Sequence, residues 1–351
     1  MLEWWRNRLG PCVSRLCPAN LVQQPCCRRR CNVLSPVVET IGLTRWYGRV
    51  LAVDHLNLTV PQGSVYGFLG PNGAGKSTTI RLLLGVLGPN EGRVELFGEP
   101  LRRNRRDLLR RVGSLIEEPS LYPNLTGAEN MEVARRMVGA TRTQAALALA
   151  TVGLTDSVAK RSVGGYSQGM RQRLGIALAL LGDPDLLILD EPTNGLDPEG
   201  ILEIRELIRA LPETMGTTVF LCSHQLREVE QVATHIGIIH RGRLLFQGTK
   251  GELWAEAVDQ LIIDVNDPER ARRALHDAGW AAIPRDETRL VVEGAGRADA
   301  GHINEMLLRC GLRVFALQRE QATLEDLFLK LTGSSAPPTR APWQAVEPIT
   351  A

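Results

Sequence analysis

Residues 70–77 read Gly-Pro-Asn-Gly-Ala-Gly-Lys-Ser, a complete G-x-x-x-x-G-K-S/T phosphate loop. A short apolar, strand-like segment, 64–69, precedes the loop, and residues 77–87 have helix-like spacing. The glycines let successive backbone N–H groups turn inward toward phosphate oxygens, where a side chain would block the approach. The sequence therefore predicts a nucleoside triphosphate site at a strand-to-helix turn.

Each part of this loop has an expected task. Lys76 places a cation on the β and γ phosphates, and Ser77 offers its hydroxyl to Mg²⁺. The phosphates would lie at a helix N-terminus, where the backbone dipole favours negative charge. The residues expected to contact the nucleotide are Gly70, Pro71, Asn72, Gly73, Ala74, Gly75, Lys76, Ser77 and Thr78.

Two later segments are predicted to reach the same edge of a parallel sheet. Residues 186–191, Leu-Leu-Ile-Leu-Asp-Glu, form an apolar strand ending in two acids, and 217–224 form a second strand ending in a histidine. We expect Asp190 to hold Mg²⁺ through water, Glu191 to polarise the attacking water and His224 to sense the γ-phosphate. Alternatively, the two acids only begin a solvated loop and the histidine is structural.

Bulk composition sets the class of protein. With 351 residues the chain can form two domains, because one core rarely grows past roughly 250 to 300 residues. Its 44% apolar and 23% charged residues are ordinary for a globular protein, and a net charge of +2 disfavours a nucleic-acid partner. The longest apolar run, 176–181, is far shorter than the roughly 20 residues of a membrane span.

The leading segment, 1–35, has a different composition from the body. It carries six arginines against one acid and lacks the apolar core of a signal peptide. Five of the seven cysteines lie in it: Cys12, Cys17, Cys26, Cys27 and Cys31. We expect a disordered extension, with an unrecognised metal or lipid site as the alternative.

A second helix start lies between the two strands. Residues 165–177 read Gly-Tyr-Ser-Gln-Gly-Met-Arg-Gln-Arg-Leu-Gly-Ile-Ala, in which a serine and a glycine begin a helix. Such an N-terminus can bind an anion, but the phosphate loop already serves the nucleotide of this chain. The sequence therefore suggests that this N-terminus serves a second molecule.

With these motifs in place, the chain resembles the ATP-binding cassette (ABC) family from Val37 to about Ala255. Residues 166–170 match the family signature, 195–197 its D-loop, and Tyr47 the ring that stacks on adenine. The resemblance implies two cassettes paired head to tail over two ATP molecules. Ser167 and Gly169 of one cassette, together with Asp197, would then complete the site held by the other.

Two departures from the family pattern suggest a subfamily. Glu117 replaces the glutamine that normally links Mg²⁺ to the membrane partner, and we expect it to serve as a metal ligand. The signature is degenerate at Gln168 and Met170. Both departures resemble cassettes of bacitracin and lantibiotic self-protection exporters, with daunorubicin-type exporters a close second.

The expected fold is an α/β P-loop cassette with a helical subdomain, followed by a small α+β domain of the split β-α-β type. The small domain is expected to include a last helix opened by 323–326, and to act in dimerisation or regulation; a passive appendage is the alternative. The expected parts are 1–35, the cassette at 36–257 with its helical subdomain at about 128–164, the small domain at 258–333 and a flexible tail at 334–351.

These observations predict an ATPase subunit of an exporter, lying peripherally at the cytoplasmic face of the membrane and paired with a separate permease. A cassette acting on ribosomes or chromosomes is the alternative. It is disfavoured because there is one phosphate loop and no room for a long coiled coil between Lys76 and Ser167. An ordinary kinase or GTPase would explain neither the signature nor the ordered run from Glu191 to His224.

Overall fold

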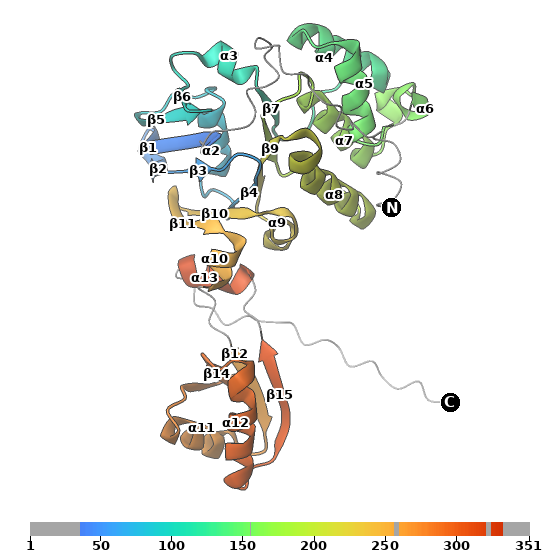
Figure 1. The fold of residues 1–351 in the computed structure, drawn as a ribbon. Coiled ribbons are helices and arrows are strands. Elements are labelled where there is room, and N and C mark those ends of the chain that lie inside the picture. The colour runs from blue at the N-terminus through green and yellow to red at the C-terminus, as the bar shows by residue number, and fades with distance from the viewer. Residues whose placement is uncertain (1–35, 155, 256–259, 321–323, 333–351) are drawn as a thin grey trace, which may run out of the picture. The chain divides into compact units, whose positions relative to one another are not determined.

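The structure is a computed structural model that describes residues 36–154, 156–255, 260–320 and 324–332 (Figure 1). The extension expected at 1–35 and the tail expected at 334–351 lie outside the described residues. No helix among the described residues is long and apolar enough to cross a membrane.

A six-stranded sheet forms the centre of the cassette. Its order is β11-β10-β4-β9-β8-β7, with five parallel strands and β11 antiparallel at one edge. The strands are β4 (Val65–Leu69), β7 (Val112–Leu115), β8 (Leu186–Asp190), β9 (Thr218–Ser223), β10 (His235–His240) and β11 (Arg243–Thr249). All residues of β4, β8 and β9 are buried, which confirms the α/β fold predicted from the apolar run at 186–190.

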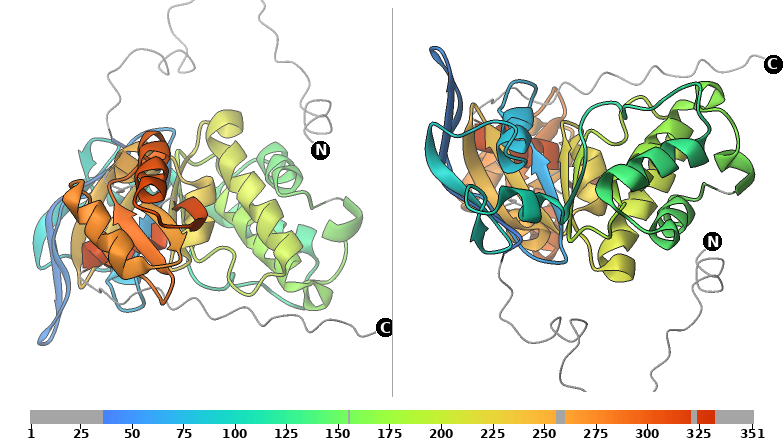
Figure 2. Two further views of the ribbon diagram at one scale, coloured as in Figure 1. Left: turned by 90° about the horizontal axis from the view of Figure 1, so that it is seen from below. Right: turned by 90° about the horizontal axis from the view of Figure 1, so that it is seen from above.

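Alternate side chains of the central strands enter two different cores. In β8, Leu187 and Leu189 pack with the helical side of the cassette, whereas Leu186 and Ile188 pack with the opposite side. Figure 2 shows helices α4–α8 on one side of this sheet and strands β1 and β2 on the other. The two-residue period of a strand therefore joins the two halves of the cassette.

The opposite side consists of a second sheet and two helices. Its strands run in the order β2-β1-β5-β6, and β3 also pairs with β1. The elements are β1 (Val38–Tyr47), β2 (Val50–Leu56), β3 (Thr59–Val60), β5 (Glu91–Leu96), β6 (Glu99–Pro100), α2 (Lys76–Leu83) and α3 (Arg105–Leu109). Because α2 begins at Lys76, within the phosphate loop, this half of the cassette carries the helix N-terminus aimed at the predicted nucleotide.

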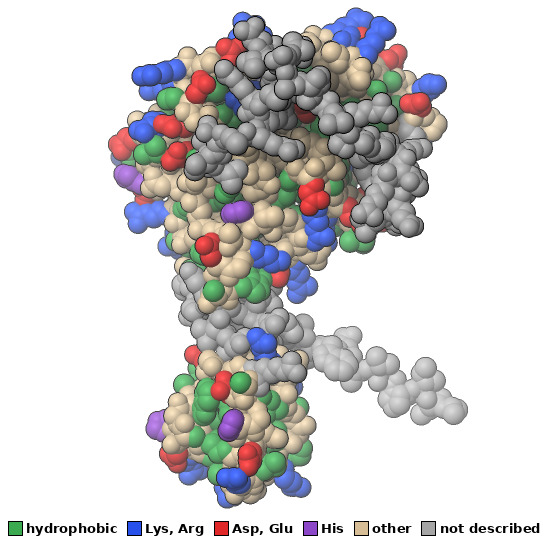
Figure 3. Space-filling model, in the orientation of Figure 1, with side chains coloured by type: hydrophobic (Ala, Val, Ile, Leu, Met, Phe, Trp, Pro, Cys, Tyr) green, Lys and Arg blue, Asp and Glu red, His purple; other side chains and the backbone are tan. Residues whose placement is uncertain are grey.

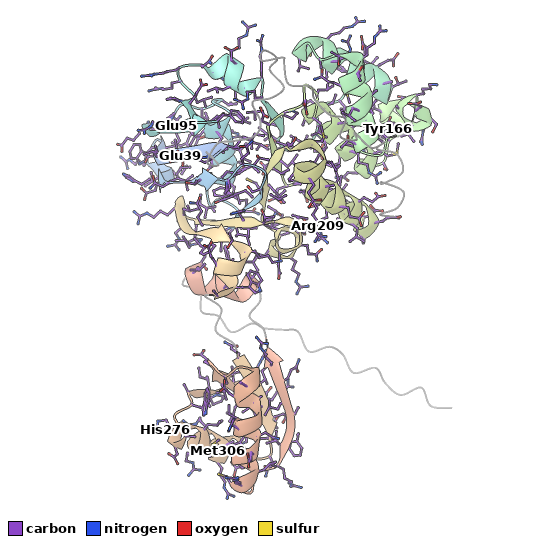
Figure 4. All side chains as sticks on the ribbon, viewed as in Figure 1. Glu39, Glu95, Tyr166, Arg209, His276 and Met306 are labelled. Atoms are coloured by element: carbon purple, nitrogen blue, oxygen red, sulfur yellow. The ribbon has the colours of Figure 1, made fainter. Side chains whose placement is uncertain are left out.

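The helical side contains the segment expected at about 128–164. Threonines 126 and 141 cap α4 and α5 with reciprocal capping boxes, and the Tyr166 hydroxyl, labelled in Figure 4, donates to the Val158 carbonyl at 2.8 Å. The helices here and after are α4 (Gly127–Val138), α5 (Arg142–Thr151), α6 (Asp156–Ala159), η2 (Val163–Gly165), α7 (Gln168–Ala179), α8 (Pro198–Met215), α9 (Leu226–Val232) and α10 (Lys250–Ala255).

The small domain is an antiparallel sheet with two helices and its own core. The strand order β13-β14-β12-β15 and the element order β-α-β-β-α-β are those of a split β-α-β fold. Its elements are β12 (Gln260–Val265), α11 (Pro268–Asp277), β13 (Ala282–Pro284), β14 (Arg289–Glu293), α12 (Arg297–Arg309) and β15 (Val314–Glu320). Strand β13 has three residues and ends in proline, so the sequence pattern did not predict it.

The last helix, α13 (Leu324–Thr332), differs from expectation. We expected it in the small domain, but Leu324 and Leu327 are buried in the core of the cassette, in the same cluster as Leu253 of α10. Helix α13 packs against α9 and β11. An amphipathic pattern shows that a helix buries one face but does not say against which domain. Along the chain, residues 260–320 are therefore inserted between α10 and α13, two helices that belong to the cassette.

We expect Leu327→Ala to destabilise the cassette by about 2–5 kcal/mol, because it leaves a cavity in the main core. The measurement is denaturant unfolding of the full chain, followed by the tryptophan fluorescence of the cassette. Leu308→Ala, on the 53% exposed Leu308 of α12, is the matched control and should change stability by less than about 0.5 kcal/mol. Equal small effects of both changes would contradict the placement of α13.

Candidate functional site

A cavity of about 460 Å³ lies at the carboxyl edge of β8, beside the phosphate loop and the start of α2. Many of the residues predicted from the sequence line it, namely Pro71, Asn72, Gly73, Gly75, Lys76, Ser77, Thr78, Glu117, Asp190 and Glu191. Segments far apart in the chain thus meet at one edge of the sheet, where ligands bind in open α/β folds.

Two positions of the loop have room for glycine alone, because a side chain there would clash with neighbouring backbone atoms. A Cβ on Gly70 would lie 2.5 Å from the Ile239 carbonyl oxygen, and one on Gly75 would lie 2.5 Å from that of Ala52. Gly73 has open space around it but a φ of +80°, which favours glycine for its conformation. Gly70 and Ala74 are buried and do not line the cavity.

Lys76 is buried inside the loop. Its Nζ donates to the Gly70 carbonyl at 2.6 Å and the Pro71 carbonyl at 3.4 Å, and lies 4.0 Å from Glu191 Oε1. Helix α2 begins at this residue, and no side chain caps its first turn. The ammonium group and the first backbone N–H groups of α2 therefore form one positive surface at the cavity wall.

Asp190 is the buried acid of the site, only 5% exposed at the end of β8. Burial raises its pKa, and the charges of Glu191 and Glu117 add to this effect, while Lys76 and a hydrogen bond from Ser77 oppose it. The described residues hold no group of three His, Cys, Asp or Glu side chains arranged for a metal. One carboxylate and one hydroxyl suit Mg²⁺, which keeps most of its ligands as water and phosphate.

Glu191 is held at both carboxylate oxygens. The backbone N–H of His224 donates to Oε1 at 2.9 Å, and the His224 ring nitrogen Nδ1 lies 2.8 Å from the same oxygen. The Ser223 hydroxyl donates to Oε2 at 3.1 Å. The backbone of Glu191 has a φ of +48°, unusual for a residue with a side chain. The predicted pair Glu191 and His224 is thus in direct contact.

Glu117 also lines the cavity, and its side chain is 71% exposed. Its backbone has a φ of +60°, and its Oε1 lies 3.5 Å from Arg81 Nη2 of α2. Glu118 also lines the cavity. The loop therefore brings two carboxylates to the site where one glutamine is usual in the family.

Tyr47 does not line the cavity. It ends β1, pairs with Val50 across the hairpin and carries the Arg45 guanidinium 5.2 Å from its ring centroid. Val50 and Leu51 line the cavity and are exposed. The sequence analysis missed these two residues because it looked for an aromatic ring, and two adjacent exposed apolar residues form no motif that would mark them.

The residues expected to serve a second chain also lie outside this cavity. Ser167 caps α7 by accepting from the Met170 N–H at 3.2 Å, and Asp197 caps α8 by accepting from the Gly200 N–H at 3.2 Å. Neither they nor Gly169 line it, whereas Gln168 does. The signature is thus folded as a helix start, as the sequence suggests.

Comparison with known proteins identifies relatives along most of the chain. A family model described as ABC transporter matches residues 53–194. The bacitracin transport ATP-binding protein BcrA of Bacillus licheniformis is 42% identical over 304 residues, covering 86% of this chain and 98% of the relative. The daunorubicin/doxorubicin resistance ATP-binding protein DrrA of Streptomyces peucetius is 38% identical over 309 residues, covering 85% of this chain and 93% of the relative.

A shorter relative and two solved structures agree with this. The lantibiotic transport ATP-binding protein SrtF of Streptococcus pyogenes is 44% identical over 206 residues, 59% of this chain and 88% of the relative. A structure described as the ATP-binding subunit of an ABC transporter has a TM-score of 0.57 and 28% identity, covering 63% of this chain and 92% of that one. A dimeric post-hydrolysis structure of the cassette MJ0796 with ADP and Pi has a TM-score of 0.54 and 25% identity, covering 60% of this chain and 98% of that one. The resemblance read from the motifs is confirmed: this chain belongs to the ABC transporter family and is one of its ATP-binding subunits.

Proposed function

We propose that this chain hydrolyses ATP in the cavity and powers export of an antibiotic, peptide or other amphiphile through a separate membrane subunit. The observation that carries the proposal is the placement of Glu191. Both of its carboxylate oxygens are held by Ser223 and His224, 4.0 Å from the phosphate-loop lysine. A fixed carboxylate beside a phosphate cradle is the arrangement that a water-activating base requires.

The residues present fit a magnesium nucleotide. Lys76 can exchange its two loop carbonyls for phosphate oxygens without leaving the loop, since its Nζ already lies inside it. Ser77 and Asp190 would hold Mg²⁺, together with Glu117, which lines the same cavity. When bound, the ion neutralises charge that develops on the phosphates. Val50 and Leu51 offer an apolar surface for the base, with Tyr47 next to them on the hairpin.

Glu191 then acts as the base. Its carboxylate accepts hydrogen bonds from the backbone and side chain of the 223–224 segment, so it has little freedom to turn away from an attacking water. His224 orients this carboxylate through Nδ1, which leaves Nε2 for the γ-phosphate. His224 would thus link the base Glu191 to the presence or absence of the γ-phosphate.

We infer that two copies of the chain pair head to tail. Ser167, Gly169 and Asp197 lie outside the cavity of their own chain, which suits residues that complete the site of a partner. The related cassette MJ0796 is described as dimeric with ADP and Pi bound. The pairing would add the dipole of α7 to the phosphates held by Lys76.

A second cavity supports a membrane partner. It measures about 1,070 Å³ and combines Arg105 and Arg106 of α3 and the following Arg110 with Met137 and Val138 at the end of α4. Figure 3 shows a group of Lys and Arg side chains at the upper right, where Figure 1 has α4. The loop after Glu117 also lines it, so we propose that the permease docks here and that the chain lies at the cytoplasmic face of the membrane.

The class of exported compound follows from the relatives. Their names associate them with bacitracin, lantibiotic and daunorubicin or doxorubicin. The first and third align over 85% or more of this chain, so the small domain is included in the similarity. We therefore propose a role in antibiotic resistance or multidrug efflux.

Glu191→Gln should retain ATP binding but lose turnover, because the amide cannot accept the proton of the attacking water. We expect hydrolysis to fall by about a hundredfold or more, with ATP-dependent pairing seen by analytical ultracentrifugation. Lys76→Ala is the control that should lose both binding and pairing. Wild-type turnover in Glu191→Gln would overturn the assignment of the base.

Asp190→Asn should stabilise the nucleotide-free protein while abolishing Mg²⁺-dependent hydrolysis. Because the folded pKa is raised, the native state binds more protons than the unfolded chain above the ordinary carboxyl range, so stability falls as pH rises. We expect a gain of roughly a few degrees in Tm at about pH 8 that shrinks toward about pH 4. Asp277→Asn, at an exposed acid, is the matched control; a Tm gain independent of pH would contradict this cause.

A further inference from the structure

A buried polar cluster lies behind the wall of the nucleotide cavity. Thr193, in the turn after Glu191, donates its hydroxyl to a Glu228 carboxylate oxygen of α9, and both residues are only 5% exposed. Arg205 Nη2 of α8 lies 3.6 Å from the other Glu228 oxygen. The cluster therefore joins the turn after the base, α8 and α9 through charged and polar atoms.

The turn that carries Thr193 has two faces. Glu191 and Asn194 line the cavity, whereas Thr193 lies between them in sequence and is buried away from it. The Asn194 N–H donates to the Glu191 carbonyl at 3.1 Å, and the Leu196 N–H donates to the Thr193 carbonyl at 3.2 Å. A movement of Thr193 would therefore move the residues that face the nucleotide.

The segment 223–228 holds this turn at two points. On the cavity side, Ser223 and His224 bind the carboxylate of Glu191. On the interior side, Glu228 binds the hydroxyl of Thr193. A single contact would leave the segment free to rotate about its own backbone. Contacts on two opposite faces of the turn, one to Glu191 and one to Thr193, prevent this rotation. This matters because Glu191 has a positive φ that its neighbours must maintain.

We propose that Thr193 and Glu228 are positioning residues for the base Glu191 and for the turn that leads to Asp197. The proposal rests on the hydrolytic function proposed above. Arg205 balances the buried charge of Glu228 and binds Gln231 of the same helix at 2.8 Å. Arg209, labelled on α8 in Figure 4, also donates to the Gln231 carbonyl and so holds α8 against α9.

The first experiment compares Thr193→Val with Thr193→Ser in the full chain. Valine keeps the shape but removes the hydroxyl, so we expect kcat to fall roughly tenfold or more while KM for ATP stays within about twofold, because the phosphate loop is not touched. Serine keeps the hydroxyl and should recover most of the lost rate. Thr214→Val removes a hydroxyl bond to Ala210 elsewhere on α8 and is the matched control.

A double-mutant cycle tests the pair itself. Glu228→Gln removes the charge, and Glu230→Gln does the same at another position of α9 as its control. If the two residues act as one contact, Thr193→Val combined with Glu228→Gln should be no slower than the slower single variant. In the Glu191→Gln background, Thr193→Val should also weaken ATP-dependent pairing, because the same turn leads to Asp197.

The outcomes separate two failures. If the wild type does not hydrolyse ATP and Glu191→Gln does not pair, the proposed function fails. If both behave as expected but Thr193→Val matches Thr214→Val in kcat per ATP-binding molecule, the positioning role fails while the function stands. A purely structural role would lower Tm and leave kcat per ATP-binding molecule unchanged, which also overturns the proposal.

Discussion

The parallel pairing of β4, β9 and β8 is the constraint on which the site depends. It brings the ends of three strands, distant in the chain, to one edge, so that Lys76, Glu191 and His224 meet there. A slip of one residue would exchange the side chains of the two cores as well as move the acids. Burial of side chains on both faces of the sheet therefore sets the register of these strands. The register in turn decides which side chains meet at the nucleotide site.

Local signals predicted most of the cassette. The glycine pattern at 70–77 and the apolar run at 186–190 depend on neighbours in sequence, and both form the expected elements. The helix after the loop ends earlier than its spacing indicated, at Leu83, close to Gly85 with a φ of +63°. The partner of α13 was not predictable, because its apolar face would suit either of two cores.

At the site, the sequence found residues that belong to motifs and missed those defined by contact. Asp190 and Glu191 were found because they follow a buried strand. Val50 and Leu51 were missed because an exposed apolar pair has no motif, and Glu228 because its partner, Thr193, lies on another element. Polar contacts across helices leave no periodic trace in a sequence, so only the fold reveals them.

The burial of Leu324 and Leu327 in the cassette changes what the small domain is. It is an insertion, entered from α10 and left into α13, rather than a module attached at one end. A polypeptide terminated anywhere within it would lack the helix that packs against α9. Nonsense mutations in this domain should thus remove part of the core of the ATPase unit itself, because Leu324 and Leu327 would be lost with α13.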